Sequence, residues 1–300
     1  TKASAAKPDL SAKPYDSTEN FVENKPAKYI GQELYLKGLS ESLREYGYAG
    51  FFIDYQIAAK SSLEKSNIYK CCNSYNANYD SLAGRYFKVL AVFAHPDADK
   101  NDFLYGKKYY LKLEEKNTKD ILYYEYDAQY EFNFPFIVLG HFEYIKKKMK
   151  GTNFVFCDKV LESAPKDIVT GKDITKAPGQ KWEFIDLTIE EKYYNLSAIV
   201  ENSRGERITV SSSDIYGPDH KGRSYNDREV ATYTTKFGAT IFNTILKNSV
   251  KVGMTKEMCT LSWGQPNKIN QTVVAGGKSE QWVYKDNYLY FANGVLTTIQ

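Results

Sequence analysis

The sequence has few of the residues that build most catalytic centres. Its 300 residues include three histidines, His95, His141 and His220, which are widely separated and form no ligand pair of the His-x-x-x-His type. It also has no Gly-x-Ser-x-Gly nucleophile turn and no glycine-rich loop for phosphate or dinucleotide binding. We therefore expect a protein that is not an enzyme and needs no cofactor. A hydrolase with a carboxylate site is the remaining enzymatic alternative, because folding brings together acids that are distant in sequence.

Long apolar runs and an excess of one charge are also absent. No stretch of about eighteen apolar residues is present to cross a bilayer, and the mean hydropathy is -0.53. Because 40 basic and 37 acidic residues leave a net charge of only +3, no overall field attracts nucleic acid. The length favours two or three domains.

The cysteines do not indicate a redox compartment. There are four of them, Cys71, Cys72, Cys157 and Cys259. A bridge between the neighbours Cys71 and Cys72 would be strained, and Cys259 falls on an apolar helix face, where a small core residue is the simplest interpretation. The sequence leaves the disulfide status open.

One acidic loop is a candidate calcium site. Asp97, Asp99 and Asn101 place oxygen ligands at alternate positions, as a calcium loop does. The sixth position is Asp102 instead of glycine and the twelfth is Lys108 instead of glutamate, so the loop is not an EF-hand. The alternative is an ordinary solvated loop between strands.

Tyrosine, in contrast, is abundant, with 26 residues. Two predicted strands carry Tyr109, Tyr110, Tyr123, Tyr124 and Tyr126, which could provide stacking surfaces for a glycan. Alternating tyrosines in strands are more often half-buried cross-strand partners. Glycan binding is therefore an alternative function.

A repeated pattern organises the middle of the chain. Four glycines are each followed, three and five residues later, by large apolar residues in an apparent strand. The groups are Gly31 with Leu34 and Leu36, Gly84 with Phe87 and Val89, Gly151 with Phe154 and Phe156, and Gly179 with Trp182 and Phe184. The pattern predicts a tandem duplication, in which 31–150 and 151–248 each form a small twisted antiparallel sheet or barrel that ends in a short helix. The alternative is that glycines before strands are simply common.

The last fifty residues have the most consistent local signals. A predicted helix is capped at its start by Thr255, ends at Gly264 and is prevented from continuing by Pro266. An amphipathic helix precedes it, and a two-residue hairpin turn at Asn293-Gly294 lies near the end of the chain. Strands are predicted at 268–274, 281–285, 288–291 and 295–299. The segment should therefore form two helices followed by a small antiparallel sheet.

This segment resembles the SmpA/OmlA (BamE-like) module of bacterial envelope proteins over residues 239–300. The matching landmarks, in order, are Gly253, Met254, Thr255, Gly264, Pro266, Trp282, Tyr284, Phe291 and Gly294. The resemblance implies a small two-layer α/β fold that is usually extracytoplasmic, occurs often in lipoproteins and is used for binding or assembly. It does not indicate what is bound.

The sequence thus predicts four segments in an α+β fold that is mainly antiparallel. They are a flexible tether at 1–28, a β-rich domain with a terminal helix at 29–150, a second β-rich domain at 151–238 and the BamE-like module at 239–300. The tether prediction rests on three prolines and few apolar anchors. A tether behind a removed signal peptide is typical of exported or lipid-anchored proteins, whereas the alternative is a disordered cytoplasmic tail.

We therefore expect an extracytoplasmic protein of the periplasm, outer membrane or cell surface. Its expected partner is a protein of the cell envelope, bound in an assembly or scaffold role. A lipid anchor at the N-terminus is the only membrane contact that we expect.

Overall fold

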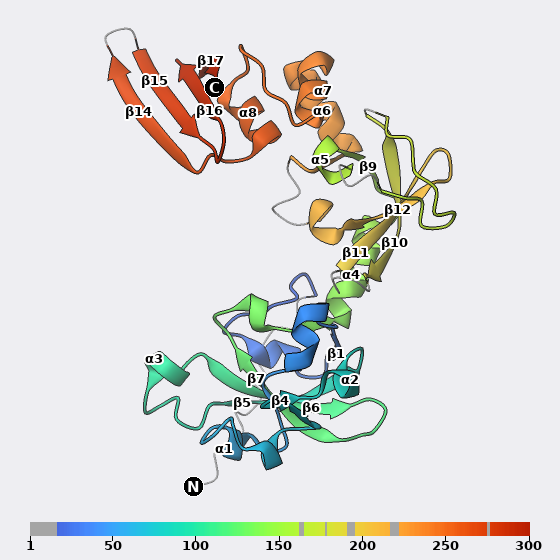
Figure 1. Cartoon of the computed structure of the whole chain (residues 1–300), viewed down its shortest axis with the longest axis vertical. Helices are drawn as coiled ribbons and strands as arrows, with labels where there is room; N and C mark the ends of the chain where they lie inside the picture. Colours follow the sequence, from blue (N-terminus) through green and yellow to red (C-terminus); the bar gives the residue numbers. More distant parts are fainter. Residues whose placement is uncertain (1–16, 162–164, 178, 191–195, 217–221, 275–276) are drawn as a thin grey trace. The chain divides into compact units, whose positions relative to one another are not determined.

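A computed structural model describes residues 17–161, 165–177, 179–190, 196–216, 222–274 and 277–300 (Figure 1). The chain divides into two compact units, Thr1–Lys148 with Ile189–Asn195, and Met149–Thr188 with Leu196–Gln300. Over the described residues the fold is α+β with mostly antiparallel sheets, as predicted. Each sheet is open, because its strands form a linear order with two edges. The barrel alternative is therefore wrong.

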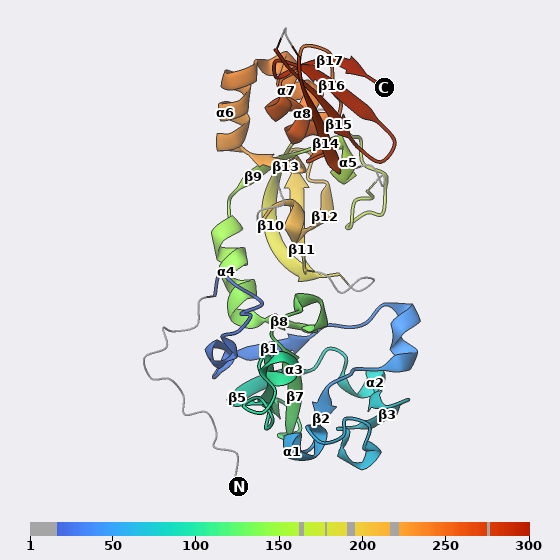
Figure 2. The ribbon, with the colours of Figure 1, turned by 90° about the vertical axis from the view of Figure 1, so that its left-hand side faces the viewer.

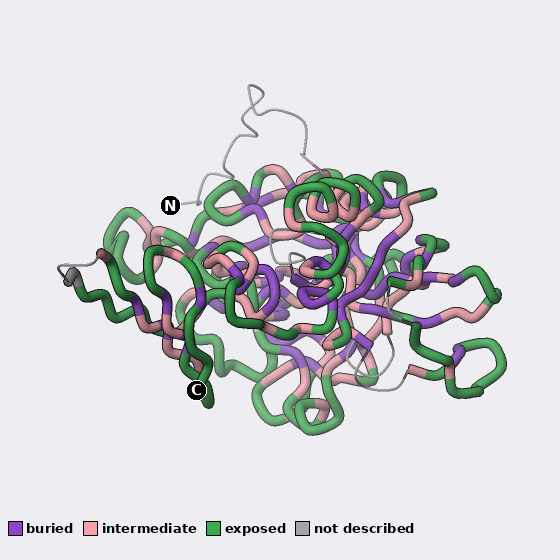
Figure 3. The backbone as a smooth tube through the Cα atoms, turned by 90° about the horizontal axis from the view of Figure 1, so that it is seen from above, coloured by how far each residue is buried: buried purple, intermediate pink, exposed green. Residues whose placement is uncertain are grey.

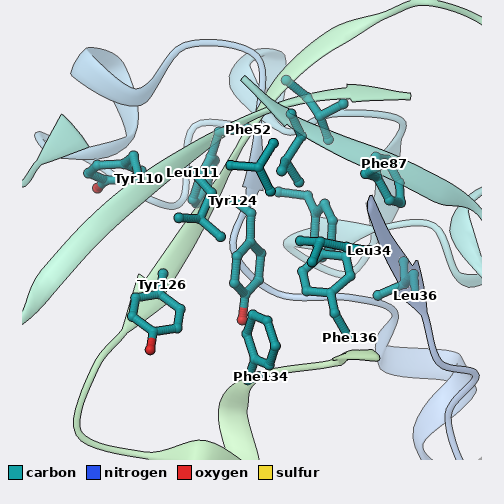
Figure 4. Packing of buried hydrophobic residues seen from close by; sticks show 14 of the residues in the cluster. Leu34, Leu36, Phe52, Phe87, Tyr110, Leu111, Tyr124, Tyr126, Phe134 and Phe136 are labelled. Carbon is teal, nitrogen blue, oxygen red and sulfur yellow. The ribbon is translucent and has the colours of Figure 1, made fainter. Parts of the chain in front are cut away.

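The N-terminal unit is built on a six-stranded sheet with the order β2-β7-β6-β5-β1-β8. Its strands are β1 (Glu33–Leu36), β2 (Phe51–Phe52), β5 (Tyr86–Ala94), β6 (Lys108–Glu115), β7 (Ile121–Asp127) and β8 (Phe136–Val138). Along β5, Phe87, Val89 and Val92 are buried, so this face of the sheet is directed into the core. Figure 4 shows the aromatic and aliphatic side chains that meet there.

Short elements connect and cover these strands. The segment between β1 and β5, which we call the covering segment (37–85), contains β2 and η2 (Glu41–Tyr46), α1 (Tyr55–Ala58), η3 (Lys65–Asn67), β3 (Cys71–Asn73), β4 (Asn76–Ala77) and α2 (Tyr79–Leu82). Elsewhere in the unit lie η1 (Pro26–Tyr29), α3 (Asp102–Tyr105), η4 (Glu131–Asn133) and α4 (Leu139–Met149). Tyr55 of α1 packs on the rings of Phe93, Tyr110 and Tyr123, with centroid distances of 4.8, 5.4 and 5.1 Å. The second face of the sheet is thereby buried in part as well.

The predicted tether is partly folded. Asn20 donates to the carbonyl of Phe136 and accepts from the amide of Val138, at 3.0 and 2.8 Å. These bonds satisfy backbone groups of the edge strand β8, and the buried Val22 adds apolar contact. Residues 20–22 therefore belong to the folded unit, and the tether prediction is wrong there. Residues 1–16 of the predicted tether lie outside the described residues.

The C-terminal unit contains a five-stranded sheet with the order β12-β11-β10-β9-β13. Its elements are β9 (Asn153–Phe156), α5 (Asp158–Leu161), β10 (Lys181–Ile189), β11 (Leu196–Asn202), β12 (Arg207–Ser211), η5 (Ser212–Asp214), β13 (Ser224–Asn226) and α6 (Asp227–Phe237).

This sheet repeats the plan of the first. In each sheet four strands form a meander, β1-β5-β6-β7 in the first and β9-β10-β11-β12 in the second. A further strand, β8 or β13, lies beside the first strand of the meander and leads directly into a helix, α4 or α6. The first sheet has β2 as an additional edge strand. The register agrees as well, since Leu34 is opposite Phe87 in the first sheet and Phe154 is opposite Trp182 in the second. These four residues stand three positions after the four glycines of the sequence pattern.

Matching backbone hydrogen bonds extend the correspondence. The amide of Val89 donates to Gln32 in the first sheet, as that of Phe184 does to Thr152 in the second. The glycines before these strands, Gly31, Gly84, Gly151 and Gly179, have φ angles of 84°, 74°, 72° and 73°. Only glycine adopts this region without strain, so the backbone turn explains the pattern.

The chain ends in two helices and a four-stranded sheet. These elements are α7 (Ala239–Leu246), α8 (Lys256–Trp263), β14 (Lys268–Val274), β15 (Gly277–Val283), β16 (Tyr288–Ala292) and β17 (Val295–Ile299), and the sheet order is β14-β15-β16-β17. Figure 2 shows α7 and α8 beside one face of this sheet. The predicted strands 268–274 and 295–299 have the observed bounds.

One core joins this segment to the preceding sheet. Val155 of β9 and Tyr225 of β13 belong to the same buried cluster as Trp282, Leu289 and Phe291. The predicted boundary at 238 therefore does not separate two hydrophobic cores. Figure 3 shows the buried stretches enclosed by exposed turns and loops. None of the described helices combines the length and apolar character needed to span a bilayer.

Candidate functional site

Two hollows in the N-terminal unit meet at one ion pair. They have volumes of about 380 and 310 Å³, and both are lined by Ser62, Leu63, Lys108 and Glu125. The larger hollow is also lined by Phe52, Tyr75, Asn76, Tyr124, Asp127 and Asn133. The smaller hollow is also lined by Lys60, Ser61, His95, Tyr105 and Tyr110. We call the two hollows together the Lys108 cleft. The covering segment supplies one wall and the sheet supplies the other.

Strand register brings the ion pair together. Lys108 begins β6, and Glu125 lies near the end of β7, where it is opposite Tyr110. Lys108 Nζ lies 3.2 Å from Glu125 Oε1, and the two side chains are 35% and 24% exposed. Both charges therefore remain accessible to a ligand, and each keeps hydrogen-bonding capacity beyond their mutual contact.

His95 is buried in the wall of the smaller hollow. Its ring stacks on Tyr105 with centroids 4.1 Å apart and planes 5° apart. The amide of Asp97 donates to His95 Nδ1 at 3.1 Å, so the proton of the neutral ring is on Nε2. Burial lowers the pKa of His95, although the charge of Glu125 opposes the shift. At neutral pH the ring is therefore uncharged and carries its proton on Nε2.

The cleft combines polar groups of both signs with apolar surface. Lys108 is a donor, while Glu125 and Asp127 are acceptors. Half-exposed Tyr75 and exposed Leu63 lie at the wall of the same space. This chemistry suits the binding of a polar ligand that also has an apolar face.

The candidate calcium residues do not assemble into a site. Asp97 Oδ1 is bound by Lys100 Nζ at 2.6 Å, and Asn101 Oδ1 accepts from the amide of Leu104 as the cap of α3. Asp99 is exposed. The side-chain oxygens of Asp97 and Asn101 thus make contacts within the loop. Alternate spacing in the sequence does not distinguish such contacts from metal ligation. No group of three or more His, Cys, Asp or Glu residues suited to a metal occurs in the described part of the chain.

The tyrosines proposed as glycan platforms are mostly core residues. Tyr110, Tyr124 and Tyr126 are buried, and Figure 4 shows them within the apolar cluster. The hydroxyl of Tyr124 donates to the carbonyl of Asn133, and that of Tyr126 donates to Glu23. Tyr109 and Tyr123 are half-buried partners of the same core. The glycan-stacking alternative for these side chains is therefore wrong, because both faces of the two strands are covered, whereas the interpretation as half-buried strand partners holds for Tyr109 and Tyr123.

The landmarks of the terminal module have structural positions. Met254, Trp282 and Phe291 are buried in its core. The hydroxyl of Thr255 accepts from the first turn of α8, and that of Tyr284 donates to the carbonyl of Gly264 at 3.0 Å. The remaining landmarks, Gly253, Gly264, Pro266 and Gly294, lie at turns or helix ends. The resemblance to the BamE-like family stays a prediction.

The cysteines fall into two classes. Cys71 and Cys72 on exposed β3 form a disulfide, although strain argued against a bridge between neighbours. Cys157 and Cys259 are buried thiols. Burial raises the pKa of each of these thiols to about 12, so both stay protonated as small core residues.

Comparison with protein-family models, curated proteins and solved structures finds no match for this chain.

Proposed function

We propose that the chain is a non-enzymatic, exported protein of the cell envelope that binds a protein partner in a scaffold or assembly role. The resemblance of residues 239–300 to the BamE-like module supports the compartment and the role. The observation that carries the proposal is the outer edge of the terminal sheet, formed by β14.

β14 is a long edge strand exposed to solvent. It pairs with β15 along seven residues and forms one edge of the sheet. Lys268, Ile269, Asn270, Gln271 and Thr272 are all exposed, and the strand contains no proline. Folded proteins usually protect such edges with prolines, bulges or several charges, because the backbone groups accept another strand. An extended segment of a protein partner fits this edge by strand addition.

We also propose that the two larger sheets arose by tandem duplication. The order of five strands, the register and the glycine positions that the two sheets share support this origin. A chain that contains two such sheets and a terminal module suits a scaffold, because such folds present several surfaces without requiring a catalytic centre.

Photo-crosslinking in cells tests the proposal. A photoreactive side chain at Asn270 should capture one or a few envelope proteins, and a set of cytoplasmic neighbours would refute both compartment and role. Thr272→Lys should reduce the crosslink yield, because a lysine on an edge strand hinders pairing. Ser279→Lys is the matched control, since Ser279 is exposed and lies opposite Thr272 on the interior strand β15. Equal yields from the two variants would argue against strand addition.

A further inference from the structure

We infer that the Lys108 cleft binds a neutral saccharide through adjacent hydroxyl groups. This inference does not depend on the proposed protein partner, because the cleft lies in the N-terminal unit and β14 in the C-terminal one.

The ion pair at the centre of the cleft matches a vicinal diol. One hydroxyl can accept from Lys108 Nζ while its neighbour donates to Glu125, and the 3.2 Å contact between the charges need not be broken. Hydrogen bonds to charged groups are shorter and stronger than those between neutral groups. A charged ligand would instead compete with one member of the pair for the other.

The surrounding charges favour a neutral ligand. Lys60 and Lys108 are balanced by Glu125 and Asp127 in the cleft wall, and His95 is uncharged at neutral pH because it is buried. The cleft therefore has no excess charge that would select an anion or a cation.

The shape and apolar surface agree with a sugar ring. Volumes of about 380 and 310 Å³ lie at the small end of the range for ligand pockets. Tyr75 is 50% exposed and Leu63 is 62% exposed. Lys65 Nζ lies over one face of the Tyr75 ring, 4.7 Å from its centroid. The C–H face of a saccharide can therefore pack on Leu63 and on the other face of Tyr75. These side chains belong to the covering segment, whereas the tyrosines suggested by the strand pattern lie in the core.

The second sheet provides an internal comparison. The β6–β7 hairpin of the first sheet corresponds to the β11–β12 hairpin of the second. Counted from the turn of each hairpin, the opposed pair Tyr110 and Glu125 corresponds to the opposed pair Ser197 and Ser211. The fold therefore forms without the aromatic ring and the carboxylate at these positions. Between β9 and β10 the described residues contain the helix α5 and the isolated bridge of Lys166 with Asp173, but no strands equivalent to β3 and β4. The groups that make the cleft are thus outside the plan that the two sheets share.

The experiment is a calorimetric titration of the full chain with sugars that differ in charge. Glucose, galactose and N-acetylglucosamine are the neutral probes, glucosamine is the cationic probe and glucuronate is the anionic one. At least one neutral sugar should bind saturably with a Kd on the order of 1 mM, the affinity expected for a ligand of this size at ordinary ligand efficiency. No saturable binding by a neutral sugar, or tighter binding of either charged sugar, would overturn the inference.

Substitutions locate the site. Glu125→Gln keeps the shape but removes the charge, and should weaken binding about tenfold. Tyr75→Ala removes an apolar surface at a half-exposed position and should weaken binding by about fivefold. Glu201→Gln is the control, because Glu201 forms a comparable cross-strand ion pair of 2.6 Å with Arg207 in the second sheet. Far-UV circular dichroism checks folding, and unchanged affinity in both cleft variants would refute the assignment.

Discussion

The alternation of faces along β16 makes a quantitative prediction. Phe291 is 1% exposed and its ring centroid lies 4.7 Å from that of Trp282, whereas Tyr288 on the opposite face is 39% exposed. Phe291→Ala should therefore remove a fully buried ring and lower the free energy of unfolding by about 3–5 kcal/mol. Tyr288→Ala should cost less than about 1 kcal/mol, because this side chain lies on the exposed face and its removal leaves no enclosed cavity.

Urea denaturation followed by tryptophan fluorescence measures this difference. All three tryptophans, Trp182, Trp263 and Trp282, lie in the C-terminal unit, so the signal reports its unfolding. With a urea slope of about 2 kcal/mol per molar, Phe291→Ala should lower the midpoint by roughly 2 M and Tyr288→Ala by less than about 0.5 M. Equal shifts would refute the face assignment, since a slip of one residue in register exchanges the two faces.

Three further substitutions test local hydrogen bonding. The Thr170 hydroxyl and neighbouring amides hold the pKa of Asp167 at about 2, below the unfolded value of about 3.9, so its stabilisation is present at neutral pH and is lost as pH falls from about 4 to about 2. Asp167→Asn should therefore reduce the dependence of the melting temperature on pH between about 4 and about 2. An unchanged dependence on pH would contradict this. Asn226→Ala removes a capping box with Glu229 and should cost about 1 kcal/mol in thermal unfolding, whereas Asn226→Asp should cost less; equal losses would exclude the cap. Asn202→Ala leaves amides of the β11–β12 turn without their acceptor and should cost about 1–3 kcal/mol in urea unfolding, so a neutral change would reject that role.

Much of the fold could be predicted because its signals are local. The glycine pattern marks turns with positive φ, and each glycine fixes where the following strand begins. In the terminal segment, Thr255, Gly264 and the Asn293-Gly294 turn define the limits of elements directly. Strand limits at 268–274 and 295–299 therefore followed from the sequence alone.

The cleft could not be predicted because its groups meet only through register and covering. Lys108 and Glu125 belong to different strands, and their contact depends on the length of the hairpin between them. The wall consists of helices and strands of two to six residues, which are too short to show a periodic pattern. The same covering explains why the glycan-stacking alternative failed, because Tyr55 of α1 packs on Tyr110 and Tyr123.

Comparison of the two sheets distinguishes the residues that the shared fold needs from those that can vary. Where the plans agree, the residues concerned are turn glycines and buried pairs such as Leu34 with Phe87 and Phe154 with Trp182, which determine register and core. Where the two sheets differ, the first has the carboxylate of Glu125 and the covering segment. An ion pair on a strand contributes little to stability when it is partly exposed, so stability alone does not account for the Lys108–Glu125 pair. Glu125 and the covering segment both line the Lys108 cleft. We therefore expect substitutions in the cleft to change ligand affinity more than the free energy of unfolding. Substitutions at the positions that the two sheets share should change the free energy of unfolding more than ligand affinity.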